Sequence, residues 1–277
     1  MSEAPLVEIR DATIFRGDTC VFDRFSLTIF QREPVAILGP NGSGKTTLLK
    51  LINREIYPVQ REGSSVRILG RDQWNVWDLR SRLGIVSHDL QVRYDDRATG
   101  LDVVLSGFQS SIGVHGAVAG RITADQRARA SSILENLGAS ELSRKQLASM
   151  STGQQRRCLL GRALVHDPDT LILDEPTAGL DLAAAFDYLE RIRRLSAAGK
   201  NIVLVCHSPG EIPPQIKRIV LLRAGRIVAD GTKDRVLTEH NLYLTYGVGV
   251  RIAEVDGYYF AYPAVPDGGT EARRQPD

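Results

Sequence analysis

Gly39-Pro40-Asn41-Gly42-Ser43-Gly44-Lys45-Thr46-Thr47 lies between the apolar run VAIL at 35–38 and the leucine-rich stretch LLKLI at 48–52. The first run has the β-branched, apolar character of a buried strand, and the second opens well as a helix. The segment between them fits Gly-x-x-x-x-Gly-Lys-Thr, a loop that holds phosphate where a strand turns into a helix. The sequence therefore predicts a site for a nucleoside triphosphate, and the flanking strand and helix disfavour an ordinary glycine-rich turn.

The chemistry of this loop is specific. Its glycines let the backbone wrap closely around phosphate, and its N–H groups and the helix N-terminus present partial positive charge to the anion. Lys45 is expected to reach the β- and γ-phosphates, and the Thr46 hydroxyl to bind Mg²⁺. We therefore expect residues 39–47 to hold the nucleotide.

Composition places few limits on function. The 277 residues suffice for one or two domains, and 43% hydrophobic with 25% charged residues is ordinary for a soluble globular protein. A net charge of +2 gives no reason to expect nucleic acid as a partner. Cys20, Cys158 and Cys206 are widely spaced, which favours reduced thiols in the cytosol. We find no signal peptide, and the apolar runs are too short to span a bilayer, so any membrane part is expected in another chain.

Strand and helix patterns alternate along the chain. Residues 6–14 and 25–30 alternate in polarity, which predicts a small antiparallel β layer at the front. Helix-forming residues dominate about 89–165, which predicts a helical insert within the β-containing body. Within the insert we expect helices at 125–137, capped near Thr123, and 153–164, with a loop at 113–120. Further predicted elements are strands at 67–70, 83–87, 170–174 and 201–206, an amphipathic helix at 182–197, and a hairpin from 219–222 and 226–229. No internal repeat is visible.

Two carboxylates end the strand at 170–174. Asp174 and Glu175 follow a buried apolar run, and a parallel strand delivers such groups at its carboxyl end. Asp174 suits Mg²⁺, which prefers oxygen ligands. Glu175 points differently and can polarise a water toward the γ-phosphate. A solvated acidic strand end is the alternative.

Two further side chains have alternative readings. His207 ends the next strand, where it could contact the γ-phosphate or be a satisfied core histidine. Phe15 lies in a predicted turn, where its ring could stack on adenine or belong to the core.

These motifs together resemble the ATP-binding-cassette family of ATPases over about residues 5–240. Residues 39–46 match Walker A, and 171–175 match Walker B. Residues 150–156 (MSTGQQR) look like the Leu-Ser-Gly-Gly-Gln signature, and 174–181 (DEPTAGLD) match Walker B with the D-loop. His207 takes the switch position, and Phe15 takes the adenine-stacking position.

The resemblance implies an α/β P-loop NTPase fold: a RecA-like core with an antiparallel β front, plus an inserted helical subdomain at about 89–165. A C-terminal extension at 241–265 would follow. The polar residues with Gly and Pro at 266–277 predict a disordered tail independently of the resemblance. Two cassettes of the family pair head to tail, so a second copy of this chain is the expected partner. Ser151, Gly153, Gln154 and Asp181 would then contact the partner's ATP, with Ser151 and Gly153 preceding a helix that begins near Gln154.

This sequence departs from the family pattern at two motifs. The signature has Met150 and Thr152 where Leu and Gly are usual. The glutamine expected after residues 84–87 is replaced by His88, and imidazole is a poor ligand for Mg²⁺. Gln91 lies three residues further on and could serve instead if the loop bends differently. The histidine at position 88 therefore puts in doubt both the Mg²⁺ ligand at this position and the usual coupling of the cassette to a permease.

The resemblance implies an ATP- and Mg²⁺-dependent hydrolase that powers an ABC membrane transporter, with Lys45, Glu175 and His207 as catalytic residues. Separate transmembrane permease chains would be its partners, at the cytoplasmic face of the membrane, and a substrate-binding protein is left open. Residues 231–247 are similar to the extension of cassettes that serve metal-chelate importers, and the signature resembles a molybdate-type subgroup. The alternative is a soluble cytosolic ABC-type ATPase with a mechanical or regulatory role. The intact Glu175 disfavours a module that binds nucleotide without hydrolysis.

Overall fold

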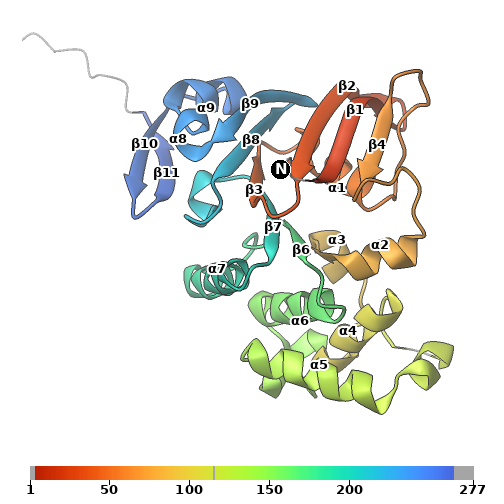
Figure 1. Ribbon diagram of the computed structural model, residues 1–277. Helices are drawn as coiled ribbons and strands as arrows, with labels where there is room; N and C mark the ends of the chain where they lie inside the picture. Colours follow the sequence, from red (N-terminus) through yellow and green to blue (C-terminus); the bar gives the residue numbers. More distant parts are fainter. Residues whose placement is uncertain (1–3, 115, 265–277) are drawn as a thin grey trace, which may run out of the picture.

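The computed structural model describes residues 4–114 and 116–264 (Figure 1). The tail predicted at 266–277 lies outside these residues. The described chain contains a six-stranded sheet of order β5-β6-β7-β3-β8-β9, parallel except for the last strand. Its strands are β5 (Leu83–Val86), β6 (Thr170–Asp174), β7 (Asn201–Cys206), β3 (Val35–Leu38), β8 (Arg218–Arg223) and β9 (Arg226–Thr232).

Both faces of this sheet are covered, which explains why its strands are apolar throughout. Val35 and Ile37 belong to one hydrophobic core, whereas Ala36 and Leu38 belong to another. The alternation follows from the two-residue period of a strand. The first core packs against α1 (Lys45–Ile52), a second sheet and Leu79, and the other against most of the remaining helices.

The second sheet is antiparallel, as predicted, with the order β2-β1-β4. Its strands are β1 (Pro5–Arg16), β2 (Thr19–Phe30) and β4 (Ser65–Ile68). Phe15 lies within β1 opposite Cys20, so the turn predicted around it is wrong. The chain reverses later, at Gly17, whose positive φ of 57° favours a residue without Cβ.

Helices dominate the predicted insert, and in Figure 1 α4, α5 and α6 group at the bottom of the view, away from β1 and β2. α2 (Val76–Arg82) precedes the insert. The helices of the insert are α3 (His88–Gln91), α4 (Gly100–Ser106), α5 (Ala124–Asn136) and α6 (Thr152–Leu164), with the 3-10 turns η1 (Gly107–Gln109), η2 (Gly116–Arg121), η3 (Ser140–Leu142) and η4 (Leu147–Ser149). Thr123 caps α5, as expected. The loop predicted at 113–120 is partly wrong, because η2 occupies most of it.

The chain continues through α7 (Leu182–Ala197), with the predicted bounds, and η5 (Pro209–Glu211). After β9 come α8 (Lys233–Val236), α9 (Glu239–Tyr246) and a separate hairpin of β10 (Val250–Val255) and β11 (Tyr258–Pro263). None of the helices in the described ranges has the length and apolar character needed to cross a bilayer. The two sheets and the group of helices between β5 and β6 confirm the predicted α/β class, with its antiparallel front and helical insert.

Candidate nucleotide-binding site

The predicted site residues meet at one edge of the parallel sheet. Strands β6, β7 and β3 are neighbours and run in the same direction. Asp174 and Glu175 come at the carboxyl end of β6, His207 follows β7, and the glycine loop follows β3. Ligands of doubly wound sheets bind outside these ends. The topology thus brings together groups that lie more than a hundred residues apart in the chain.

The glycine loop forms a cradle for an anion. Gly44 is the N-cap of α1 with φ 110°, and no side chain caps the helix, so its first N–H groups stay available. A Cβ on Gly39 would lie 2.1 Å from the carbonyl oxygen of Leu222, so a larger residue cannot fit there. The Ser43 hydroxyl is buried without a hydrogen-bond partner among the described residues. This orphaned group and the uncapped helix fit a bound phosphate.

Gly225, which is distant from this loop in the sequence, contacts it in the structure. The sequence patterns did not identify this residue. Its N–H donates to the carbonyl of Ser43 at 2.9 Å. Its φ is 73°, and a Cβ there would lie 1.8 Å from the Val21 carbonyl oxygen. The Ala-Gly pair at 224–225 signalled the hairpin turn, but nothing in the sequence connected this turn to the phosphate loop.

Lys45 is buried at the centre of the site. Its ammonium donates to the carbonyls of Gly39 at 2.7 Å and Pro40 at 3.1 Å. It also lies 3.6 Å from a carboxylate oxygen of Glu175. The structure therefore brings together the predicted phosphate-binding lysine and the predicted base.

The backbone of Glu175 is held in the left-handed region, with φ 45°, which is rare for a residue with a side chain. Its N–H donates to the carbonyl of Val205 at 2.8 Å. Its own carbonyl accepts a hydrogen bond from the buried guanidinium of Arg156, which also donates to the carbonyl of Ala178 at 2.7 Å. These contacts fix the direction in which the Glu175 carboxylate projects.

Sequence reasoning missed Arg156. Burial lowers the pKa of its guanidinium, and the nearby Tyr188, Asp174 and Glu175 oppose that shift. A signal existed, because Arg156 shares the buried face of α6 with Leu159, Leu160 and Ala163 at helical spacing. A charged residue on such a face needs partners, and here they are backbone carbonyls.

The carboxyl group of Asp174 has a raised pKa. Burial and the neighbouring Glu175 raise the pKa of its carboxyl to about 6, against the opposing pull of Lys45. Asp174 and Thr46 line one cavity of about 560 Å³. Within the described residues, no group of three or more His, Cys, Asp and Glu side chains is arranged to hold a metal ion. A magnesium ion here would therefore need phosphate oxygens in addition to Thr46 and Asp174, which fits a nucleotide-bound cation.

His207 and Phe15 are not core residues. The His207 side chain is 48% exposed, and its Nε2 lies 3.4 Å from a carboxylate oxygen of Glu211. Burial raises the pKa of Glu211, and the nearby His207 opposes that shift. Phe15 is 47% exposed on β1. Their exposure removes the core alternative for both, while the proposed contacts with nucleotide stay predictions.

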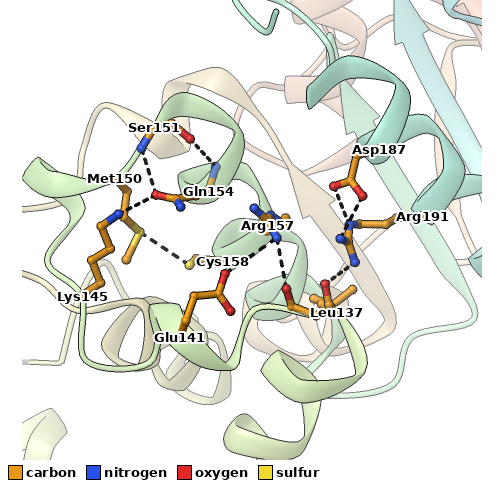
Figure 2. Close-up of polar contacts among 11 residues, drawn as sticks. Leu137, Glu141, Lys145, Met150, Ser151, Gln154, Arg157, Cys158, Asp187 and Arg191 are labelled. Atoms are coloured by element: carbon orange, nitrogen blue, oxygen red, sulfur yellow. Dashed lines mark hydrogen bonds and ion pairs between the residues drawn. The ribbon is translucent and has the colours of Figure 1, made fainter. Parts of the chain in front are cut away.

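The signature residues form the start of α6 (Figure 2). Ser151 is the N-cap, with its hydroxyl accepting from the Gln154 N–H, and the Gln154 amide oxygen accepts from the Ser151 N–H and from Lys145 at 2.9 Å. The helix begins at Thr152, one residue before the predicted range 153–164 and two before Gln154. The capping box starts the helix earlier because it pairs two N–H groups that would otherwise lack partners.

Gly153 therefore lies inside the first turn of α6 instead of preceding it. A Cβ there would come within 3.2 Å of the Ala184 Cβ, so the glycine allows α6 and α7 to approach closely. Asp181 caps α7 through a hydrogen bond from the Ala184 N–H, 2.8 Å long.

The region of the replaced glutamine contains α3. His88 is its first residue, and its side chain lies outside the described part of the chain. The Gln91 amide donates to the Gln155 side-chain oxygen at 2.7 Å, which connects it to α6. Metal binding by either residue stays a prediction.

Comparisons with known proteins agree with this geometry. A sequence profile of the ABC transporter family matches residues 22–178. The hemin import ATP-binding protein HmuV of Bradyrhizobium diazoefficiens is 29% identical, over 97% of this chain and 98% of its own length. The cobalt import ATP-binding protein CbiO of Rhodobacter capsulatus is 34% identical, over 81% and 78%.

Among solved structures, a metal-chelate type ABC transporter in an inward-facing conformation superimposes with a TM-score of 0.74. Identity is 22%, and 94% of this chain and 96% of that chain are covered, so the match shows a shared fold. The family profile spans more than half of the chain, and the resemblance read from the motifs is confirmed. This chain therefore belongs to the ABC transporter family, as one of its ATP-hydrolysing cassettes.

Proposed function

We propose that this chain is the ATP-hydrolysing subunit of a membrane importer for a metal chelate, working as a head-to-tail pair of cassettes. The observation that carries the proposal is the placement of Lys45 3.6 Å from Glu175, beside the uncapped start of α1. A cation that binds phosphate and a carboxylate that orients water are two of the groups that γ-phosphoryl transfer to water uses.

In the proposed reaction, the loop N–H groups and Lys45 bind and orient the triphosphate. Glu175 accepts hydrogen bonding from the attacking water, which displaces ADP and leaves inorganic phosphate. Magnesium, held by Thr46 and Asp174, would neutralise charge on the phosphate oxygens. His207 would contact the γ-phosphate. The rigid backbone at Glu175 keeps its carboxylate in place while charge develops.

The position of the signature supports a paired arrangement. Ser151 is exposed, and none of residues 150–154 is among the described residues that line the cavity containing Thr46 and Asp174. The N–H groups in the first turn of α6 that the capping box does not use, together with the Ser151 hydroxyl, suit an anion supplied by another molecule. A second copy of the chain would supply it, with Asp181 near the seam.

The cavity that reaches Asp174 also suits a permease. Its other walls include the apolar side chains Leu49, Ile85, Leu90, Val92 and Ile112 and the basic side chains Lys50, Arg80, Arg93 and Arg162, together with the acidic Glu55 and Asp89, which pair with Arg80 and Lys50. Val92 is 67% exposed there. We propose that a short cytoplasmic helix of a separate permease chain docks in this cleft, with acidic residues facing Arg93 and Arg162.

The proposed cargo is a metal chelate. The hemin importer's cassette aligns over nearly the whole length of both chains, beyond the ATPase motifs, and this includes the C-terminal extension. Within this reading we propose that residues 5–240 form the ATPase domain, 89–165 its helical subdomain, and 241–265 the extension. Import of an oxyanion is the less supported alternative.

Purification of the tagged chain from detergent-solubilised membranes tests the proposal. We expect recovery of a multi-span protein and Mg²⁺-dependent ATP hydrolysis by the complex. Val92→Asp should lose the multi-span partner and keep hydrolysis. Val59→Asp, at a 40% exposed valine outside the cleft, is the matched control and should keep both. Hydrolysis without any membrane partner would select the soluble mechanical or regulatory ATPase.

A further inference from the structure

The C-terminal extension contacts the segment that carries His207. The Tyr246 hydroxyl, at the last residue of α9, donates to the His207 carbonyl at 2.8 Å, across 39 residues of sequence. Burial raises the pKa of this phenol, so it stays a hydrogen-bond donor at neutral pH. The His207 imidazole itself stays half exposed beside Glu211. The Tyr246 hydrogen bond thus goes to the backbone of His207 and not to its ring.

Lys233 of α8 and the hairpin of the extension pack on the same segment. The buried ammonium of Lys233 donates to the carbonyls of Pro213 at 3.0 Å, Ile212 at 3.4 Å and Gly257 at 3.3 Å, which joins the segment after η5 to the hairpin. A Cβ on Gly210 would lie 3.3 Å from the Phe260 ring of β11. Residues 207–213 are therefore fixed by α8, α9 and β11, all outside the stretch that the family profile matches.

We propose that Tyr246 is a positioning residue for ATP hydrolysis: its hydroxyl fixes the His207 backbone, so the imidazole is directed to the γ-phosphate. The proposal rests on the role of His207 in the proposed function. Loss of the hydroxyl leaves the His207 carbonyl without this donor and lets the loop after β7 sample other conformations. Turnover of bound ATP should then fall, while ATP affinity, set by the glycine loop, stays unchanged.

Steady-state hydrolysis by Tyr246→Phe tests this inference, since the change removes only the hydroxyl. We expect kcat to fall about three- to tenfold, in line with the loss of one hydrogen bond, with KM for ATP unchanged. Tyr243→Phe is the matched control, because Tyr243 lies on the same helix and is 55% exposed. It should hydrolyse ATP at the parent rate.

A double-variant cycle separates positioning from general stability. If Tyr246 acts through His207, Tyr246→Phe should cause no further loss of kcat in a His207→Ala background. A further loss of the same size in that background, or a parent-like kcat for Tyr246→Phe alone, would overturn the inference. If His207→Ala alone retained the parent kcat, the role of His207 in the proposed function would fail as well, which is a distinct result.

Discussion

Asp174 should destabilise the nucleotide-free protein, and its replacement by asparagine should reveal by how much. Its carboxyl is largely buried, and its pKa is raised from 3.8 to about 6. The folded protein thus binds this proton more tightly than the unfolded chain does. Stability therefore falls as pH rises from about 4 to about 6, and the full cost persists above that window.

The size of the effect follows from the shift. A change from 3.8 to about 6 corresponds to at most about 3 kcal/mol at pH 8, and partial exposure to solvent reduces it. Asp174→Asn keeps the shape of the side chain and removes the charge. We expect the variant to be more stable than the parent by about 1–3 kcal/mol at pH 8, and by about half as much at pH 5.

Urea unfolding of the nucleotide-free protein at the two pH values measures this difference. Asp169→Asn is the matched control, since Asp169 lies just before β6 and is exposed. The same Asp174→Asn variant should lose the Mg²⁺-dependent part of ATP affinity. A variant less stable than the parent at pH 8, or an advantage equal at both pH values, would refute the reasoning.

Three further changes probe the site. Glu175→Gln should lower the rate of hydrolysis at least about 100-fold, because the variant loses the proton acceptor. Its ATP affinity, measured with a fluorescent ATP analogue, should be retained. Loss of both hydrolysis and ATP affinity would make Glu175 a binding residue. Arg156→Met should cost about 2–4 kcal/mol in urea unfolding, since the carbonyls of Glu175 and Ala178 lose their donor, and an unchanged midpoint would contradict this. Gly225→Ala should weaken ATP binding and lower the melting temperature, because its Cβ would collide with the Val21 carbonyl; a parent-like Kd would count against its support of the loop.

Local sequence patterns predict the structure correctly where the residues that form a feature are also neighbours in the sequence. The glycine loop lies between an apolar strand and a helix, and the structure places β3 and α1 there. Asp174 ends a strand of four apolar or uncharged buried residues, so its position followed from the pattern alone. Phe15 was placed in a turn because of Gly17, although pairing with Cys20 extends β1 beyond it.

Contacts between distant segments could not be predicted from sequence. The guanidinium of Arg156 donates to backbone carbonyls of the Walker B and D-loop segment. Every residue has a backbone carbonyl, so the sequence does not indicate which one accepts such a hydrogen bond. The same holds for the bond from Gly225 to Ser43 and for that from Tyr246 to His207. The start of α6 differs from the predicted one by one or two residues, because the Ser151 and Gln154 side chains form a capping box that starts the helix at Thr152.

Light scattering of Glu175→Gln with saturating Mg-ATP tests the central claim most directly, namely that triphosphate bound by the loop of one copy is enclosed by the signature helix of another. The account predicts that the mass doubles with Mg-ATP and returns to that of one chain when Mg²⁺ is chelated. A species that keeps the mass of a single chain at saturating nucleotide would contradict it.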